Sequence, residues 1–354
     1  MAPAGQESSC WAGRAAMTER AGICCTGNWI VDRVKTVDVW PQEETLANIL
    51  DEETGTGGAA CNVAIDLSRF GLDLGVSGVG LVGRDTDGER IFADCEAAGI
   101  DTSFLRATGD APTSYTDVMT VRDSGRRTFF HNRGANALLS PEHYPLDELS
   151  CRILTLGYLL LLDRMDEEDA EYGTRAARVL AGCRQRGILT MVDVVSEDSD
   201  RFARVVTPAL GHVDYLVINE IEAARTTGTE IRRDGTLDRD ALEKAAGILI
   251  DSGVKEAVVL HTPEAAFGLK ASGEGSWRAA HSLPGGFIRG SAGAGDAFFA
   301  GIVAGVYEGW DLGESLGFAN AAAASCLRHP TCTGGVGSAA EIRELALGLS
   351  LREE

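Results

Sequence analysis

Residues 290–301 read Gly-Ser-Ala-Gly-Ala-Gly-Asp-Ala-Phe-Phe-Ala-Gly, so that small residues lead directly into an apolar helix. The free N–H groups at the start of such a helix carry about half a positive charge, which favours a bound phosphate. Asp296, in the first turn, is placed to take a proton from a hydroxyl group that attacks phosphorus. Taken alone, the same pattern also describes a turn followed by a helix whose N-terminal aspartate is favoured by the helix dipole.

The chain has 354 residues, and its 32 basic and 53 acidic side chains give a formal net charge of −21. Nucleic acids and anionic membranes bind to basic faces, so this balance argues against either as a partner. A small anion stays compatible, because a few local donors can hold it. No apolar stretch is long enough to cross a membrane. The nine cysteines have no zinc-type spacing, which favours reduced thiols and a cytoplasmic location.

Apolar runs of strand length alternate with amphipathic, helix-length segments along most of the chain. This rhythm predicts a mostly parallel sheet covered by helices on both faces. Two segments, about 32–56 and 112–134, do not follow it and indicate a small β-structure beside the main sheet, with one turn at 123–125. We expect one domain over residues 21–345, after a disordered extension at 1–20. The predicted strands are 23–30, 74–79, 153–161, 188–195, 213–218 and 256–260, and the predicted helices are 59–70, 88–98, 167–186, one from 220, 240–252, 295–308 and 314–328.

A formal GxGxxG sequence at residues 78–83 offers a dinucleotide-binding alternative. A Rossmann unit enters its helix at the third glycine, whereas residues 84–88 read as a further turn. The sequence also comes well after the first predicted strand. We therefore interpret residues 78–83 as a turn.

Three other elements accompany the Gly-Ala-Gly-Asp at 293–296. Residues 57–64 read Gly-Gly-Ala-Ala-Cys-Asn-Val-Ala, residues 134–137 read Gly-Ala-Asn-Ala, and residues 219–222 read Asn-Glu-Ile-Glu. In order and approximate separation, the four resemble the signatures of the ribokinase-like (PfkB-type) carbohydrate kinases, from about residue 22 to 340. The resemblance implies a three-layer α/β ribokinase-like fold with a small β-sheet lid.

The same resemblance implies ATP-dependent phosphorylation of a hydroxyl group on a small sugar or sugar acid, with Mg²⁺. Asp296 would be the general base, and the N–H groups of Gly293, Ala294 and Gly295 would form the anion hole. A nucleoside kinase is one alternative. A non-catalytic sugar-binding member of the family is another.

Five residues are implied as substrate contacts. Asp32 would hold sugar hydroxyls, although a strand-end carboxylate can also cap a turn. Asn62 would join it, although an asparagine near a helix start is also a capping residue. Arg133 would meet a carboxylate or phosphate on the substrate, although most such arginines are solvated surface. Gly58 and Asn136, in the two glycine-containing elements, complete the set.

Asn219 and Glu222 would organise the nucleotide phosphates, with Glu222 holding Mg²⁺ through water. The same Asn-x-x-Glu pattern is close to a helix capping box, and the sequence leaves both roles open. Asn320 matches a nucleotide-contact position.

The chain departs from the family where cation-activated members carry an Asp-Thr pair, because residues 290–291 are Gly-Ser. A monovalent cation is therefore not expected, and we hypothesise that Arg289 partly replaces it. Lids in this family often pair between subunits, so we expect a homodimer formed through the lid.

Overall fold

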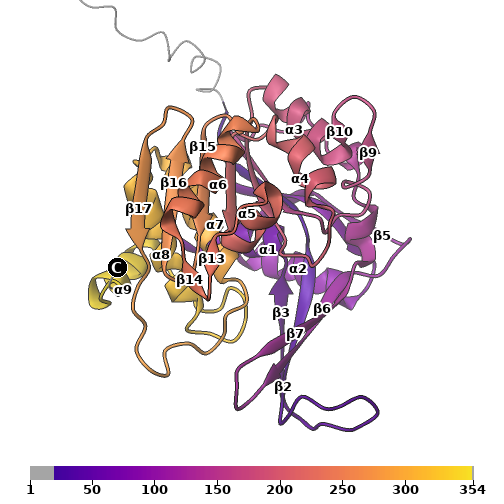
Figure 1. Ribbon diagram of the computed structural model, residues 1–354. Helices are drawn as coiled ribbons and strands as arrows, with labels where there is room; N and C mark the ends of the chain where they lie inside the picture. The colour runs from indigo at the N-terminus through magenta and orange to yellow at the C-terminus, as the bar shows by residue number, and fades with distance from the viewer. Residues whose placement is uncertain (1–19, 353–354) are drawn as a thin grey trace, which may run out of the picture.

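A nine-stranded sheet forms the centre of the protein in the computed structural model, which describes residues 20–352 (Figure 1). Six neighbouring pairs are parallel, and only the two pairs at one edge are antiparallel. The mostly parallel sheet predicted from the sequence is thus confirmed. In spatial order the strands are β17 (Gly275–Ala279), β16 (Ala265–Lys270), β15 (Ala257–His261), β12 (Tyr215–Asn219), β11 (Leu189–Val194), β8 (Ile153–Leu159), β1 (Ile23–Gly27), β4 (Val76–Gly83) and β5 (Asp101–Thr108).

Helices cover both faces of this sheet and make a three-layer structure. Side chains of β1 alternate between the two cores, with Ile23 and Cys25 in one and Cys24 in the other. One core is closed by α1 (Ala59–Arg69), α2 (Thr86–Ala97), α7 (Ala294–Glu308), α8 (Leu312–Cys326) and α9 (Ala339–Gly348). The other is closed by α3 (Arg175–Gln185), α4 (Phe202–Leu210), α5 (Glu220–Thr227) and α6 (Arg239–Asp251).

A separate four-stranded sheet projects from the body near the start of α1 (Figure 1). Its order is β3 (Ile49–Gly57), β2 (Ile30–Val37), β6 (Ser114–Val121) and β7 (Arg127–Asn132). It is built from the two segments that break the strand–helix rhythm, as predicted. Asp32, Thr116 and His131 are cross-strand partners, so their side chains lie on one face of this small sheet.

The prediction of a turn at residues 78–83 is wrong, because these residues lie in the central strand β4. Gly78 and Gly80 are needed there for space: a Cβ atom at either position would lie 2.6 Å or 2.2 Å from the ring of Trp29. The Trp29 ring is fully buried, and its Nε1 donates a hydrogen bond to the carbonyl of Val79 at 3.0 Å. The glycines therefore make room for an aromatic side chain and not for a dinucleotide.

Other boundaries differ for local reasons. The predicted strand at 23–30 is divided after Gly27, which has φ of +122° and lies against the carbonyl of Gly157. The predicted helix at 167–186 begins only at Arg175, because β9 (Glu168–Asp169) and β10 (Gly173–Thr174) form a short hairpin before it. The elements β5, α4, β16, β17 and α9 were not predicted. The expected extension at 1–20 lies outside the described residues, apart from Arg20.

In the described part of the chain, no helix is both long and apolar enough to span a membrane. The eight cysteines between residues 20 and 352 are all free and buried.

We predict that Gly80→Ala destabilises the fold by about 1–3 kcal/mol, because the added methyl group overpacks the Trp29 site. Urea unfolding monitored by circular dichroism measures the change. Gly247→Ala is the matched control, since no atom lies within 4 Å of a Cβ placed at this position in α6. It should be neutral or stabilising. Equal stability of the Gly80→Ala protein and the wild type would contradict the packing argument.

Candidate active site

The carboxyl ends of β1, β8, β11 and β12 lie side by side in the sheet, at the edge where ligands usually bind in α/β folds. Asn28, Tyr158, Asp193 and Asn219 stand at or close to these strand ends. The N-terminus of α7, which carries Asp296, contacts the same edge through the side chain of Tyr158. A candidate site is thus assembled from parts of the chain more than 260 residues apart.

Asp296 is the centre of this site. It is only 4% exposed, and its two carboxylate oxygens accept hydrogen bonds from the Tyr158 hydroxyl at 2.6 Å and from Asn62 Nδ2 at 2.7 Å. Burial raises the pKa of Asp296 above its usual value, although these two hydrogen bonds act in the opposite direction. A raised pKa makes the carboxylate a stronger base, and its remaining lone pairs can receive a proton.

The three residues before Asp296 form the N-terminus of α7. Gly293 has φ of +80°, and a Cβ atom there would lie 2.3 Å from the carbonyl oxygen of Cys332. Only glycine fits this position without moving the backbone. Residues 293–295 are half-buried, and the first N–H groups of a helix have no acceptor within it. This geometry suits a small anion.

Asp32, on the small sheet, is linked to the same loop. The thiol of Cys332 donates a hydrogen bond to Asp32 Oδ2 at 3.0 Å. Both residues are buried, and burial raises the pKa of Asp32 to about 6, with Asp296 adding to the rise. Gly57 lies so close that a Cβ atom there would be 2.1 Å from Asp32 Oδ2. Asp32, the carboxylate predicted to bind the substrate, therefore lies near the anion hole. It has no basic partner among the described residues.

Gly58 and Asn62 lie between these two carboxylates. Gly58 has φ of +84°, and a Cβ atom there would come within 2.5 Å of the Asn28 carbonyl. Asn62 donates through Nδ2 to Asp296, while its Oδ1 is buried and has no hydrogen-bond partner. Buried polar atoms are nearly always paired, so the orphaned Oδ1 is free to accept a hydrogen bond from a ligand.

Two other predicted substrate residues have different tasks in the structure. Asn136 is fully buried; its Nδ2 donates to the carbonyl of Trp29 at 3.1 Å, and its Oδ1 accepts from the N–H of Trp29. We assign it to holding the chain at Trp29. Arg133 forms ion pairs with Asp163 at 2.6 Å and Glu197 at 3.3 Å, so its charge is already balanced.

Arg127 and His131 lie on the Asp32 face of the small sheet, and Arg127 is not among the predicted site residues. Arg127 has no carboxylate partner in residues 20–352, and burial lowers its pKa. His131 accepts or donates through Nδ1 to the Thr116 hydroxyl at 3.0 Å, while its Nε2 is buried without a partner. Burial lowers the pKa of His131 to about 4, so the ring is neutral.

A second pair of carboxylates, Glu222 and Asp193, lies near Asp296. Glu222 and Asn219 form the capping box of α5, and Ser196 donates to Glu222 Oε1 at 2.7 Å. Glu222 is nevertheless almost fully buried, and burial raises its pKa to about 7. Asp193, at the end of β11, is also buried, and its pKa is raised well above the usual value by burial and by the charges of Glu222 and Asp296. The capping role is thus present, and so is an excess of negative charge that a cation would relieve.

A cavity of about 430 Å³ opens beside α7. It extends from Asn219 past Gly295 to Asn320 and is lined mainly by apolar side chains, including Phe298. Asn320 donates through Nδ2 to the carbonyls of Arg278 and Ala279, both at 3.3 Å, so its amide also supports the cavity wall. His261, whose ring centroid is 4.8 Å from that of Phe298, also lines the cavity. The cavity adjoins the anion hole and has the size of a nucleotide base and ribose site.

Tyr158 and Asp193 were missed by sequence reasoning. Each lies at the end of a predicted strand, 153–161 or 188–195, so strand-end position was the available signal. Neither residue belongs to one of the four signature elements, so the motifs do not point to them.

Residues 20–337 match the family described as pfkB family carbohydrate kinases. The chain is 28% identical over 299 residues to the ATP-dependent ribose-1-phosphate kinase of Halopiger xanaduensis, covering 84% of this chain and 88% of that protein. It is 24% identical over 331 residues to the ribokinase of Bacillus subtilis, covering 91% and 98%. The structure of Arabidopsis thaliana ribokinase complexed with ribose and ATP superimposes with a TM-score of 0.73, at 20% identity, over 92% of this chain and 99% of that one. The ribokinase structure from Giardia lamblia gives a TM-score of 0.75 at 19% identity, with the same coverage.

The raised pKa of Asp32 predicts that replacing this residue by a neutral one stabilises the protein, and that the gain depends on pH. The folded protein binds the Asp32 proton more tightly than the unfolded chain, so this favourable protonation is lost as pH rises through about 6. Asp32→Asn should therefore be more stable than the wild type at pH 8, by up to about 3 kcal/mol, and similar to it at pH 4. Urea unfolding at both pH values measures this. A difference that does not change with pH would contradict the assignment.

Proposed function

Because this chain belongs to the pfkB family of carbohydrate kinases, we propose that it transfers the γ-phosphoryl group of ATP to a hydroxyl group of a small sugar or sugar acid. The observation that carries the proposal is the placement of the buried Asp296 carboxylate directly beside the open N-terminus of α7. A base and an anion-binding site are the two parts that phosphoryl transfer requires of a protein.

In the proposed reaction, Asp296 takes the proton of the substrate hydroxyl as its oxygen attacks the γ-phosphorus. The bond from phosphorus to the bridging oxygen of ADP breaks, and ADP leaves with the electron pair. The N–H groups of Gly293, Ala294 and Gly295 face the charge that develops on the transferred group. Tyr158 and Asn62 hold the Asp296 carboxylate in one orientation through their hydrogen bonds.

Asp32 and Asn62 are proposed to bind the sugar. An ionised carboxylate accepts hydrogen bonds only, so Asp32 can receive two sugar hydroxyl groups. The unpaired Oδ1 of Asn62 supplies a further acceptor between Asp32 and Asp296. Gly57 and Gly58 allow the backbone to lie close to Asp32 and Asn28, because side chains at these two positions would collide with those residues.

Arg127 supports an acidic substrate. It lies on the sugar-facing side of the small sheet, it has no carboxylate partner in the described chain, and it is partly buried. A negative group on the substrate would supply the missing charge-assisted hydrogen bonds. Arg133, by contrast, is already paired with Asp163 and Glu197.

A nucleoside kinase remains the second candidate. Phe129 lies on the same face of the small sheet as Asp32 and is 58% exposed, so its ring is available to stack on a base. The non-catalytic alternative is not favoured, because Asp296 and all three anion-hole residues are in place.

The donor set near the anion hole fits Mg²⁺. Among residues 20–352 no cluster of three or more ligating side chains can hold a metal by itself. Glu222 and Asp193 are buried carboxylates without basic partners, and Mg²⁺ in such sites is held by one or two carboxylates, water and substrate phosphates. When bound, Mg²⁺ would neutralise phosphate charge; Glu222 would hold it through water.

We propose that the protein works without a monovalent cation beside the anion hole. A side chain at Gly290 would collide with the carbonyl of His329, 2.3 Å from the position of a Cβ atom. The thiol of Cys326 donates to the carbonyls of Cys332 at 2.9 Å and Ala292 at 3.4 Å, so a neutral donor occupies the oxygens next to the anion hole. Arg289 is exposed and has no side-chain contact of this kind. We therefore propose that Cys326, and not Arg289, partly replaces the monovalent cation.

The small sheet is proposed to act as a lid and to form a homodimer. A lid that covers the sugar excludes water and limits ATP hydrolysis. Most of the large exposed apolar side chains between residues 20 and 352 lie on this sheet or on its loop between β2 and β3. Such a concentration marks an interaction surface. The residues are Val39, Trp40, Leu46, Ile49, Leu50, Phe129 and Phe130.

A coupled ADP-release assay over neutral sugars, sugar acids, sugar phosphates and nucleosides tests the proposed function. We expect ADP release that depends on a sugar or sugar acid. For an acidic substrate, Arg127→Gln should raise KM about tenfold or more, because a charged hydrogen bond is lost. Arg126→Gln, the adjacent exposed arginine, is the control and should leave KM unchanged. Turnover with nucleosides alone would overturn the sugar assignment in favour of the second candidate.

Activity should be the same whether the supporting salt contains K⁺ or tetramethylammonium, because the Cys326 thiol already donates to the carbonyls of Cys332 and Ala292. Cys326→Ser keeps a donor and should remain active. Cys326→Val leaves two carbonyls unpaired and should destabilise the protein by about 1–3 kcal/mol. Several-fold activation of the wild type by K⁺ would contradict this interpretation.

Light scattering should give the mass of a dimer, and replacing the stacked pair Trp40 and Phe130 by serine should give a monomer. Leu347→Ser removes an even more exposed apolar side chain from α9 and should leave the dimer intact. A monomeric wild type at assay concentration would contradict the lid interface.

A further inference from the structure

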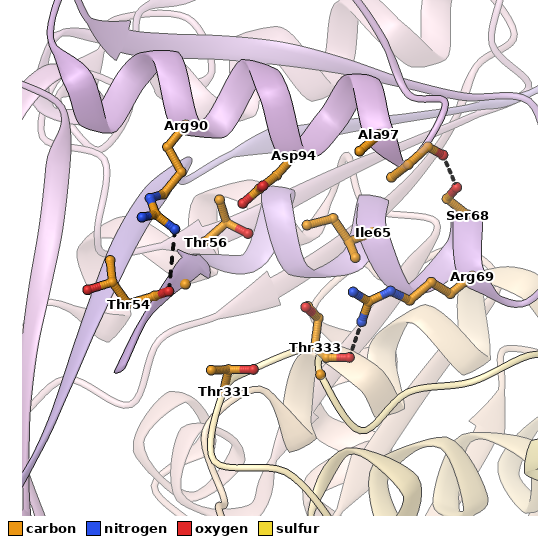
Figure 2. Close-up of a pocket in the computed structure, with 13 residues that line it drawn as sticks. Thr54, Thr56, Ile65, Ser68, Arg69, Arg90, Asp94, Ala97, Thr331 and Thr333 are labelled. Carbon is orange, nitrogen blue, oxygen red and sulfur yellow. Dashed lines mark hydrogen bonds between the residues drawn. The ribbon is translucent and has the colours of Figure 1, made fainter. Parts of the chain in front are cut away.

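A second cavity, of about 490 Å³, lies outside the site described above (Figure 2). Its walls come from three places: β3, the facing helices α1 and α2, and the loop at residues 331–334. None of its lining residues was predicted to be functional. Its volume is within the range of small-molecule sites.

Two arginines face this cavity from opposite helices, Arg69 from α1 and Arg90 from α2 (Figure 2). Neither forms an ion pair with any carboxylate of residues 20–352. Arg69 donates to the carbonyl of Thr333, and Arg90 donates to the carbonyl of Thr54 at 3.4 Å. A guanidinium group has five N–H donors, so most of their donors stay available for an anion. In a chain with a net charge of −21, such a pair is not explained by general surface composition.

Between the arginines the lining is polar. The side-chain hydroxyls of Thr54 and Thr333 make no hydrogen bond within the described chain, and Thr333 is 7% exposed. Asp94 stands on α2 between the two arginines and pairs with neither (Figure 2). A carboxylate at this place repels a bare anion but accepts hydrogen bonds from hydroxyl groups. The lining therefore suits a ligand that combines a phosphate with hydroxyls.

The cavity shares its walls with the candidate active site. Thr56 directly precedes Gly57 and Gly58 on β3. Thr331 and Thr333 flank Cys332, whose thiol contacts Asp32 and whose carbonyl packs against Gly293. Because β3 is the edge strand of the small sheet, a ligand here would join that sheet to the body of the protein. It would thereby hold both sides of the sugar site in place.

We propose that this cavity is an effector site for a small phosphorylated sugar, and that its occupation strengthens sugar binding in the active site. Arg90 supplies charge-assisted donors to the phosphate, and Arg69 faces the same cavity from the opposite side. Asp94 and the threonines are the partners of the hydroxyl groups. The ligand belongs to the same chemical class as the product of the proposed kinase reaction. The binding part of the proposal stands independently of that reaction; the kinetic part rests on it.

Isothermal titration calorimetry without ATP tests the binding part, with ribose 5-phosphate as the probe and ribose and inorganic phosphate as comparisons. We expect ribose 5-phosphate to bind more tightly than either. Arg90→Gln should weaken its binding at least tenfold, because a charge-assisted contact is lost. Asp32→Asn, in the active site, should leave it unchanged. Arg106→Gln, an exposed arginine on β5, is the matched control.

Arg69 also supports the loop through Thr333, so Arg90→Gln is the decisive variant, and its melting temperature should equal that of the wild type. Loss of binding in Asp32→Asn but not in Arg90→Gln would place the probe in the active site and overturn the proposal. Equal affinity for inorganic phosphate would overturn the sugar phosphate class. In the kinase assay, ribose 5-phosphate should lower the KM for the sugar several-fold in the wild type and not in Arg90→Gln. Binding without any change in KM would overturn the coupling.

Discussion

The structure of the site depends on one close approach, between the start of α7 and the carbonyl of Cys332. The two segments lie so close at Gly293 that no side chain fits between them. The loop before α7 and the loop at 331–334 are therefore fixed against each other. The Cys332 thiol extends this contact to Asp32 on the small sheet, and the Cys326 thiol bonds the carbonyls of both loops. The anion hole, the proposed base and the proposed sugar carboxylate are thus held as one unit.

Burial of several carboxylates at one edge of the sheet has an electrostatic consequence. Asp32, Asp193, Glu222 and Asp296 all have raised pKa values, chiefly because burial disfavours their charged forms. None of the four has a basic partner among the described residues. Burying these charges without basic partners lowers the stability of the folded protein. Part of that free energy would be recovered when hydroxyl groups, or a cation with its phosphates, bind to the carboxylates. A net charge of −21 is therefore compatible with the proposed nucleotide, because N–H groups of the backbone would supply the positive potential.

Much of this arrangement could be predicted from sequence. The alternation of strands and helices could be predicted because each element buries its side chains at its own period. The pattern at residues 293–296, taken alone, left a phosphate site and an ordinary helix start equally open, and only the resemblance to a kinase family favoured the phosphate site. The roles of residues 78–83, Asn136 and Arg133 could not be predicted in the same way. The glycines of β4 are there to make space for Trp29, and the amide of Asn136 holds the same residue. Arg133 finds Asp163 and Glu197 only after folding. Each of these depends on a partner far away in the chain.

The central claim is that Asp296 acts as the proton acceptor and is not needed to bind the sugar. The most direct measurement compares Asp296→Asn with the wild type in two ways, by turnover and by calorimetric sugar affinity. The amide keeps the shape of the side chain but cannot take a proton at neutral pH. We predict that turnover falls by about a hundredfold to ten-thousandfold, the range of general base catalysis, while sugar affinity stays close to that of the wild type. Turnover near the wild-type rate would contradict the account.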